Sequence, residues 1–139
     1  MPKLARIALG VAAILLFAVP AEAQVAKAES KKSSLVGTWE RTNFPGKEYR
    51  QLKTYSDDSH FVWVIYIVAD GEVAGAGGGT YTFDGTALEE KYLYGSGNIK
   101  TFIKQPPPSF TVKFEGEGWV QAGKAPNGAM LHETYRRAK

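Results

Sequence analysis

The stretch GGTYTFDGTALEEKYLY, residues 78–94, gives the clearest indication of the fold. Apolar or aromatic residues alternate with polar ones on both sides of the dipeptide Asp84-Gly85. A period of two predicts strands with one face in the core and one face in water. Asp-Gly between two such segments is a strong hairpin signal, because the tight primed turns need residues with positive φ. We therefore expect two antiparallel strands, at 78–84 and 87–94.

On both sides of this hairpin, the same pattern of short apolar segments and turn residues repeats along the chain. Short apolar bursts are separated by turn residues, and no long segment shows a clean helical face. Short strands about ten residues apart are typical of an antiparallel sandwich or barrel. The further strands that we expect are 35–41, 49–56, 60–68, 99–103, 109–115, 118–123 and 129–137. A meander hides its edges best by closing on itself, so we expect an all-β fold: an antiparallel up-and-down β-barrel of eight or nine short strands, rather than a Greek-key sandwich.

The glycine-rich run before the hairpin, residues 75–79, raises the question of a phosphate-binding loop. A dinucleotide loop needs a third glycine where this sequence has Thr80, and a helix where it has the strand-like TYTF; a P-loop lysine is also missing. Glycine inside a strand marks a bulge, a sharp bend or the close approach of another backbone. We therefore interpret the run as part of a hairpin arm that leaves room for a ligand at one end of the barrel.

The first 23 residues have the pattern of a secretory signal peptide. A basic start precedes an apolar run, Ile7 to Val19, and small residues follow at Ala21 and Ala23. That run is too short for a membrane span, which needs roughly 20 residues. We expect cleavage near Ala23, a flexible leader at 24–34, one domain at 35–139, and a secreted or periplasmic location. Because the chain has no cysteine, the domain must rest on packing and hydrogen bonds.

The segment Leu35-Val-Gly-Thr-Trp-Glu40 resembles the opening motif of the lipocalins and the wider calycin group. The resemblance implies that Gly37 and Trp39 close one end of the barrel and that Arg137 packs across the indole as a cation–π contact. The remaining chain resembles a narrower group of short, secreted bacterial lipocalin-like domains without a settled activity. The matching pieces are SHFVW (59–63), GGGTYTF (77–83), the tyrosines at 92 and 94, and the final Glu-x-Tyr-x-Arg.

Aromatic residues are the main functional signal, because this many rings cannot all lie on the surface of a small domain. A barrel with several inward tyrosines resembles a ligand cavity, which is apolar with a few convergent polar groups. We therefore expect a binding protein for a small apolar or amphipathic molecule held inside the barrel; the alternative is an interior filled by its own side chains. The candidate ligand-binding residues are His60, Trp63, Tyr66, Tyr81, Glu90, Tyr92 and Glu133.

Two other functions stay open at this point. Glu90 and Glu133 fall on tyrosine-bearing faces and, with His60, could serve as acid–base groups of an isomerase, a cyclase or a hydrolase. The alternative for the glutamates is a structural role, in which one or both pair with Arg41, Arg137 or a tyrosine hydroxyl. Alternatively, the domain is a protein-interaction module with a filled core. That hypothesis is motivated by the stiff loop Gln105-Pro-Pro-Pro108 and by the segment 60–68, which is apolar on both faces and which we therefore expect to be covered on both sides.

Composition and spacing exclude several classes of function. The formal net charge is only +3, and no lysine–arginine cluster points to nucleic acid. His60 and His132 stand in no metal-ligand spacing, and there is no nucleophile elbow and no thiol. We expect no cofactor, no metal, no catalytic nucleophile, no membrane span in the mature protein, and a monomer or weak homodimer.

Overall fold

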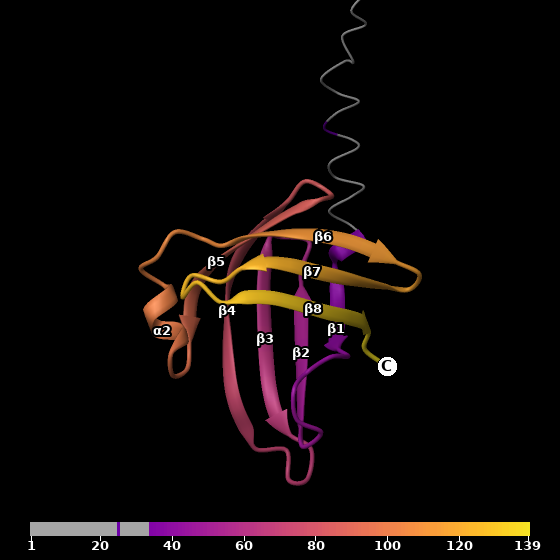
Figure 1. The fold of residues 1–139 in the computed structure, drawn as a ribbon, viewed down its shortest axis with the longest axis vertical. Helices are drawn as coiled ribbons and strands as arrows, with labels where there is room; N and C mark the ends of the chain where they lie inside the picture. Colours follow the sequence, from indigo (N-terminus) through magenta and orange to yellow (C-terminus); the bar gives the residue numbers. More distant parts are fainter. Residues whose placement is uncertain (1–24, 26–33) are drawn as a thin grey trace, which may run out of the picture.

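Eight antiparallel strands form a closed barrel in a computed structural model that describes Val25 and residues 34–139 (Figure 1). Each strand pairs with its neighbours in the sequence, and β8 closes the barrel on β1. The predicted all-β, up-and-down barrel is therefore confirmed. The strands are β1 (Gly37–Arg41), β2 (Tyr49–Tyr55), β3 (His60–Ile67), β4 (Val73–Phe83), β5 (Ala87–Gly95), β6 (Ser109–Glu115), β7 (Gly118–Lys124) and β8 (Met130–Arg137). The predicted signal peptide and nearly all of the predicted leader lie outside the described residues.

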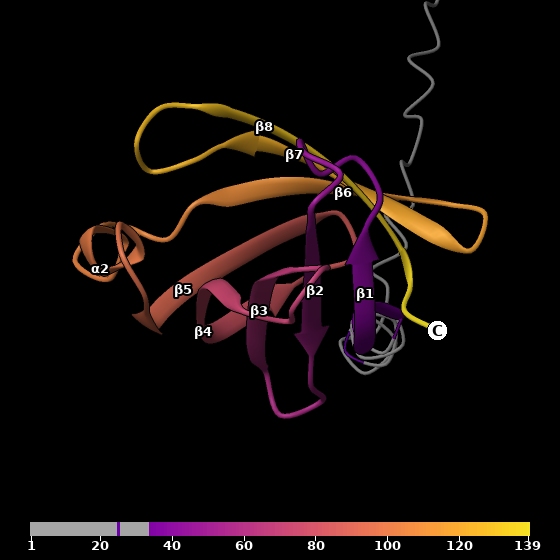
Figure 2. The same cartoon turned by 90° about the horizontal axis from the view of Figure 1, so that it is seen from below.

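The predicted strand at 99–103 is wrong, because this segment contains the short helix α2 (Ile99–Phe102). Ile99 and Phe102 are three residues apart, so a helical turn places both on one side, whereas a strand would place them on opposite faces. Phe102 packs on the ring of Tyr92, with 6.1 Å between the centroids. Figure 2 shows α2 beside the end of β5, while β6, β7 and β8 cross over the wall formed by β2 to β5.

The glycine-rich run lies inside β4, which begins at Val73 rather than at the predicted residue 78. A Cβ on Gly79 would lie only 1.9 Å from the Lys91 carbonyl oxygen, so β4 and β5 approach each other too closely there for any side chain. A Cβ on Gly77 would lie 3.1 Å from the Trp63 ring. The strand pairing also shifts between Gly78 and Gly79, as a bulge does. The glycines therefore leave space for the backbone of β5 and for the inward-pointing indole of Trp63.

The outer face of β3 is partly exposed among the described residues. Phe61 and Trp63 point inward and are buried, but Val62 between them is 44 % exposed, and Val68 just after the strand is 49 % exposed. The described residues therefore leave part of the outer face of β3 in solvent, and its cover by the leader or by a partner stays a prediction.

The end of the barrel at the start of β1 is closed by an arginine and a tryptophan. The guanidinium carbon of Arg137 lies 3.9 Å from the centroid of a Trp39 ring, and its Nη1 donates a hydrogen bond to the Val36 carbonyl oxygen at 2.8 Å. A Cβ on Gly37 would lie 1.8 Å from Arg137 Nη1, so only glycine leaves room for the guanidinium. The Trp39 indole N–H donates to the Leu35 carbonyl oxygen at 2.8 Å. The contact that the lipocalin resemblance implies is thus present.

Aromatic rings fill the barrel next to this closed end. Trp119 is fully buried and stacks on Tyr135, with 4.3 Å between the ring centroids and 14° between the planes. Its edges meet Trp39 at 5.9 Å and Tyr55 at 6.0 Å. Such pairs contribute beyond the area that they bury. This half of the barrel is therefore a packed core.

Candidate functional site

A cavity of about 240 Å³ opens at the other end of the barrel. Its lining residues come from the end of β1, the start of β2, the ends of β3, β5 and β7, and the start of β8, together with α2 and two loops. The upper wall is aromatic and aliphatic, formed by Phe44, Trp63, Ile65, Ile99, Phe102 and Leu131. The polar lining residues are Arg41, Gln51, Lys53, Glu90, Gln121 and Glu133, with Asn127 at the rim.

A buried ion pair between Lys53 and Glu90 is the first part of the polar floor. Lys53 Nζ lies 3.1 Å from Glu90 Oε1 and 3.4 Å from Gln121 Oε1. The side chains of Lys53 and Glu90 are only 3 % and 1 % exposed, and the Tyr55 hydroxyl also donates to Glu90. Burial disfavours the ammonium, but the carboxylates of Glu90 and Glu133 outweigh that effect and raise the pKa of Lys53. Lys53 is therefore a cation at neutral pH and not a free amine.

A second ion pair joins Glu133 to Arg41. Arg41 Nη1 lies 2.9 Å from Glu133 Oε1 and donates to Gln51 Oε1 at 3.3 Å. Tyr135 donates its hydroxyl to Glu133 Oε2 at 2.7 Å. The Nε of Arg41 donates to Asn43 Oδ1 at 3.1 Å, so the guanidinium is fixed from the β1–β2 loop as well.

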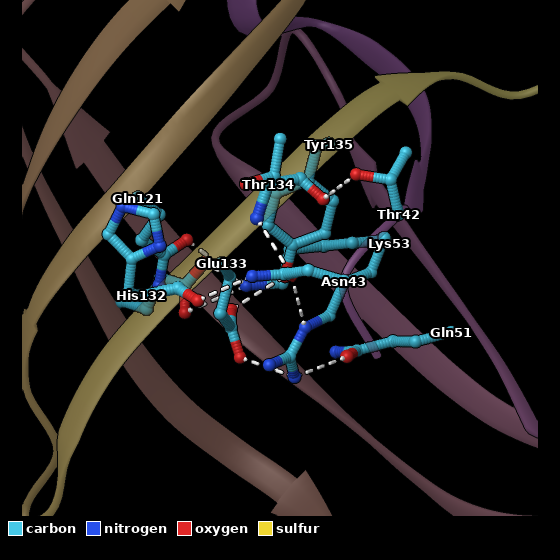
Figure 3. Close-up of polar contacts among 11 residues, drawn as sticks. Thr42, Asn43, Gln51, Lys53, Gln121, His132, Glu133, Thr134 and Tyr135 are labelled. Atoms are coloured by element: carbon cyan, nitrogen blue, oxygen red, sulfur yellow. Dashed lines mark hydrogen bonds and ion pairs between the residues drawn. The ribbon is translucent and has the colours of Figure 1, made fainter. Parts of the chain in front are cut away.

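The loop that carries Asn43 is itself attached to β8. Asn43 Nδ2 donates to the His132 carbonyl oxygen at 2.8 Å, and its Oδ1 accepts from the Thr134 backbone N–H at 3.0 Å. Thr42 donates both its backbone N–H and its hydroxyl to the Thr134 carbonyl oxygen. These contacts, drawn in Figure 3, continue the pairing of β1 with β8 beyond Arg41. They hold one wall of the cavity in place.

The floor carries two cations and two carboxylates, so its charges balance. The tyrosines around it add neutral hydroxyl groups. Burial raises the pKa of Tyr55, Tyr92 and Tyr135, and the nearby carboxylates Glu90 or Glu133 act in the same direction. All three hydroxyls therefore stay protonated at neutral pH. The cavity combines an apolar wall with a floor that is polar but has no net charge.

Four of the residues predicted for ligand binding come together in this cavity: Trp63, Glu90, Tyr92 and Glu133. The burial of both glutamates follows from the inward faces expected for their strands. Trp63 Nε1 is buried and makes no hydrogen bond among the described residues, although it lies close enough to the Tyr92 hydroxyl to oppose, in part, the rise in that group's pKa.

The other three predicted residues lie elsewhere. His60 is 57 % exposed at the β2–β3 turn, where its Nδ1 is 3.2 Å from Asp58 Oδ1. Tyr66 pairs with Arg50 and follows the inward Ile65, so it belongs to the outer face. Tyr81 is buried in the filled half and donates its hydroxyl to the Ser56 carbonyl oxygen at 2.7 Å. None of these three lines the cavity.

The sequence prediction contains Arg41 only as a possible partner of the glutamates, and it does not contain Gln51, Lys53 or Gln121, although all three lie on faces that the period of two defines. Gln51 and Lys53 share a face of β2 with Tyr55, and Gln121 shares a face of β7 with Trp119. An aromatic anchor thus marks the inward face in both strands. Polar side chains are mostly exposed, so residue type alone gives no reason to expect these three inside.

Tyr81 gives the structure a measurable pH dependence. Burial, and then the charges of Asp57 and Asp58, raise the pKa of Tyr81 from 10.0 to about 12. The unfolded chain releases the tyrosine proton at lower pH than the folded chain, so the stability from Tyr81 is complete below pH 10 and is lost as the pH rises toward 12. Urea denaturation between these limits should show a falling free energy of unfolding.

The control for this pH dependence is Tyr81→Phe, which removes the titrating group from both states. The decline should become shallower in this variant, with the remainder due to Tyr55, Tyr92 and Tyr135, whose pKa values are also raised. Identical slopes in the two proteins would contradict the assignment to Tyr81.

Comparison with known proteins does not assign a function to this site. No model of a known protein family matches the chain, and no curated protein matches it. Among the described residues, no helix is both long and apolar enough to cross a membrane. The same part of the chain contains no group of three side chains that could hold a metal ion. The site must therefore be interpreted from its own chemistry.

Proposed function

We propose that this protein is a secreted, lipocalin-like binding protein that holds a small amphipathic molecule in the open half of its barrel. The observation that supports this most directly is the cavity of about 240 Å³ with an apolar wall above a charge-balanced floor. Ligand pockets combine apolar walls with a few fixed polar groups in this way. The signal-like first 23 residues and the lipocalin-like opening motif support the export and the family likeness.

The pairing of the floor charges favours an uncharged ligand. Lys53 is neutralised by Glu90, and Arg41 by Glu133. A charged group entering the cavity would lose its hydration and would have to compete with a formed ion pair. An uncharged group that both donates and accepts hydrogen bonds can bind beside the pairs without breaking them. We therefore infer a ligand with a neutral polar group toward the floor and an apolar body against Ile99 and Phe102.

The same pairing favours binding over acid–base catalysis. A general base needs an acceptor that is free to take a proton from its substrate. Glu90 already accepts from Lys53 and Tyr55, and Glu133 accepts from Arg41 and Tyr135. His60, the third group of the enzyme hypothesis, lies outside the cavity.

Binding can be tested with a panel of small amphipathic compounds, using native mass spectrometry and the fluorescence of Trp63 in the cavity wall. A bulky side chain at the rim, Ala129→Phe, should weaken the binding of any hit about tenfold or more by occupying the mouth. The matched control is Ala74→Phe, the same substitution at an exposed position of β4 that does not line the cavity. Equal affinities in the two variants would place the ligand elsewhere, and the absence of any hit in the wild-type panel would contradict the proposal.

A further inference from the structure

A second hollow lies on the outside of the barrel, next to the cavity but separate from its floor. It has a volume of about 290 Å³ and is lined by parts of β1, β2 and β8 and by the β1–β2 loop. Arg41 and Phe44 line both hollows and form the wall between them. Successive strand residues point to opposite faces. Glu40, Arg50 and Arg136 therefore lie on the outer face, while their sequence neighbours Arg41, Gln51 and Tyr135 face inward.

The centre of this outer groove is one carboxylate that holds two arginines. Arg50 Nη1 contacts Glu40 Oε1, while Arg136 donates through Nε and Nη2 to Glu40 Oε2, at 3.2 and 2.9 Å. The Glu40 side chain is only 14 % exposed, whereas Arg50 and Arg136 are 49 % and 56 % exposed. A guanidinium has five N–H donors. Within the described residues, each arginine uses one edge on Glu40 and keeps donors that face solvent.

The groove has more positive than negative charge. Arg50, Arg136 and Lys47 line it together with a single carboxylate, Glu40. Arg41 also lines the groove, but its charge is paired with Glu133. The pKa of Glu40 is lowered, first by the hydrogen bond from Arg136 and also by Arg50, so this carboxylate is ionised at neutral pH. Glu48 lies nearby against Gly46 and reduces the excess from two positive charges to one.

We propose that this groove binds a phosphate group, with Arg50 and Arg136 as the principal donors and Lys47 as the accessory cation. Arginine pairs with phosphate through two parallel N–H donors, and a guanidinium already fixed by a carboxylate is preorganised to do so. A phosphate monoester carries between one and two negative charges near neutral pH, which matches the charge excess of the groove. The rings of Phe44 and Tyr49, 6.2 Å apart, form an apolar wall for the group that carries the phosphate.

The test is a titration of the isotope-labelled full domain with glycerol 3-phosphate, followed by NMR at constant ionic strength, with sodium chloride as the comparison. Amide signals of Arg50, Arg136 and the loop around Lys47 should shift with phosphate and not with chloride. Arg50→Gln should weaken the affinity about tenfold by removing charge-assisted hydrogen bonds. Glu40→Gln should strengthen it, because the amide oxygen still accepts a hydrogen bond and holds an arginine in place, while the negative charge that opposes phosphate is removed. Lys113→Gln, at a position 77 % exposed on β6, makes the same charge change outside the groove and should leave the affinity unchanged.

Several outcomes would overturn this proposal: no shifts at the groove, equal losses for Arg50→Gln and Lys113→Gln, or weaker binding by Glu40→Gln. If Arg50→Gln does not fold, as judged by circular dichroism, Lys47→Gln takes its place, because that lysine has no ion pair to lose among the described residues. Co-sedimentation with phosphatidate vesicles that depends on Arg50 would assign the phosphate to a lipid headgroup. Binding of glycerol 3-phosphate without co-sedimentation would assign it to a soluble ester.

Discussion

Replacing Lys53 by methionine is expected to lower the free energy of unfolding by about 3–5 kcal/mol, the cost of breaking a buried ion pair on one side. The substitution keeps most of the side-chain volume and removes the ammonium. Glu90 would then have lost its counter-ion at 1 % exposure, with the Tyr55 hydroxyl as its principal remaining donor. Gln121 would also lose the ammonium that donates to its Oε1. Urea denaturation followed by tryptophan fluorescence measures this loss directly.

The double variant Lys53→Met/Glu90→Gln tests whether the loss of stability comes from the unpaired charge or from the changed side-chain packing. Removing both charges leaves neutral groups in the floor, so most of the stability should return. The surface control is Lys113→Met, which breaks the exposed pair of Lys113 with Glu115 and should cost about 1 kcal/mol or less. If Lys53→Met and Lys113→Met cost the same, or if the double variant is no more stable than Lys53→Met, the ion pair does not have the role that we assign to it.

The two halves of the barrel follow from different physical requirements. Around Trp39 and Trp119 the rings pack on one another, so this half needs no polar partner inside except at the edges. Toward the mouth, the inward positions of β2, β5, β7 and β8 become polar or charged: Gln51, Lys53, Glu90, Gln121 and Glu133. A charge in that place costs free energy unless it is paired. The two ion pairs make a polar, open half compatible with a stable closed half.

The fold could be predicted because each strand carries its own signal. One example is the hairpin of β4 and β5. It can be predicted from its own residues alone, because apolar and polar residues alternate around Tyr81 and Phe83 and the turn is Asp84-Gly85. Closure of the barrel could be predicted from the number of strands, because a meander of eight or nine strands hides its edges best by closing on itself. The segment of α2 was too short for its pattern to distinguish a helix from a strand. Two apolar residues separated by two others fit a single helical turn, but they do not exclude a short irregular strand.

The site was harder to predict because it depends on which polar residues face inward. Glu90 and Glu133 could be found, since they alternate with tyrosines and leucines on faces that are otherwise apolar. Arg41 could be named as a candidate partner from the sequence, but the pairing of Lys53 with Glu90 across the barrel could not. His60 and Tyr66 were selected by residue type and strand alone. His60 lies outside the cavity because it belongs to the turn beside Asp58, and Tyr66 lies outside it because its side chain is on the outer face of β3.

Trp119 is the position where truncation should be most damaging in the closed half. The substitution Trp119→Ala should cost about 3–5 kcal/mol, as truncation of large buried aromatics does. Its side chain is completely buried, and the substitution would remove the stack on Tyr135 and the edge contacts with Trp39 and Tyr55 together. This is a large share of the roughly 5–15 kcal/mol by which a domain of this size is stable. Thermal unfolding followed by circular dichroism should show a fall in Tm of roughly 15 °C or more.

Trp119→Phe distinguishes lost packing from lost polar contact. The indole N–H of Trp119 is buried and has no hydrogen-bond partner among the described residues, so phenylalanine removes an unsatisfied donor while keeping a ring to stack on Tyr135. We expect this variant to cost about 1–2 kcal/mol, which is well below the alanine value because the cavity that it leaves is smaller. If the phenylalanine and alanine variants were equally unstable, the ring stack would contribute little, and the stability of the closed end would have to come from the contact between Arg137 and Trp39.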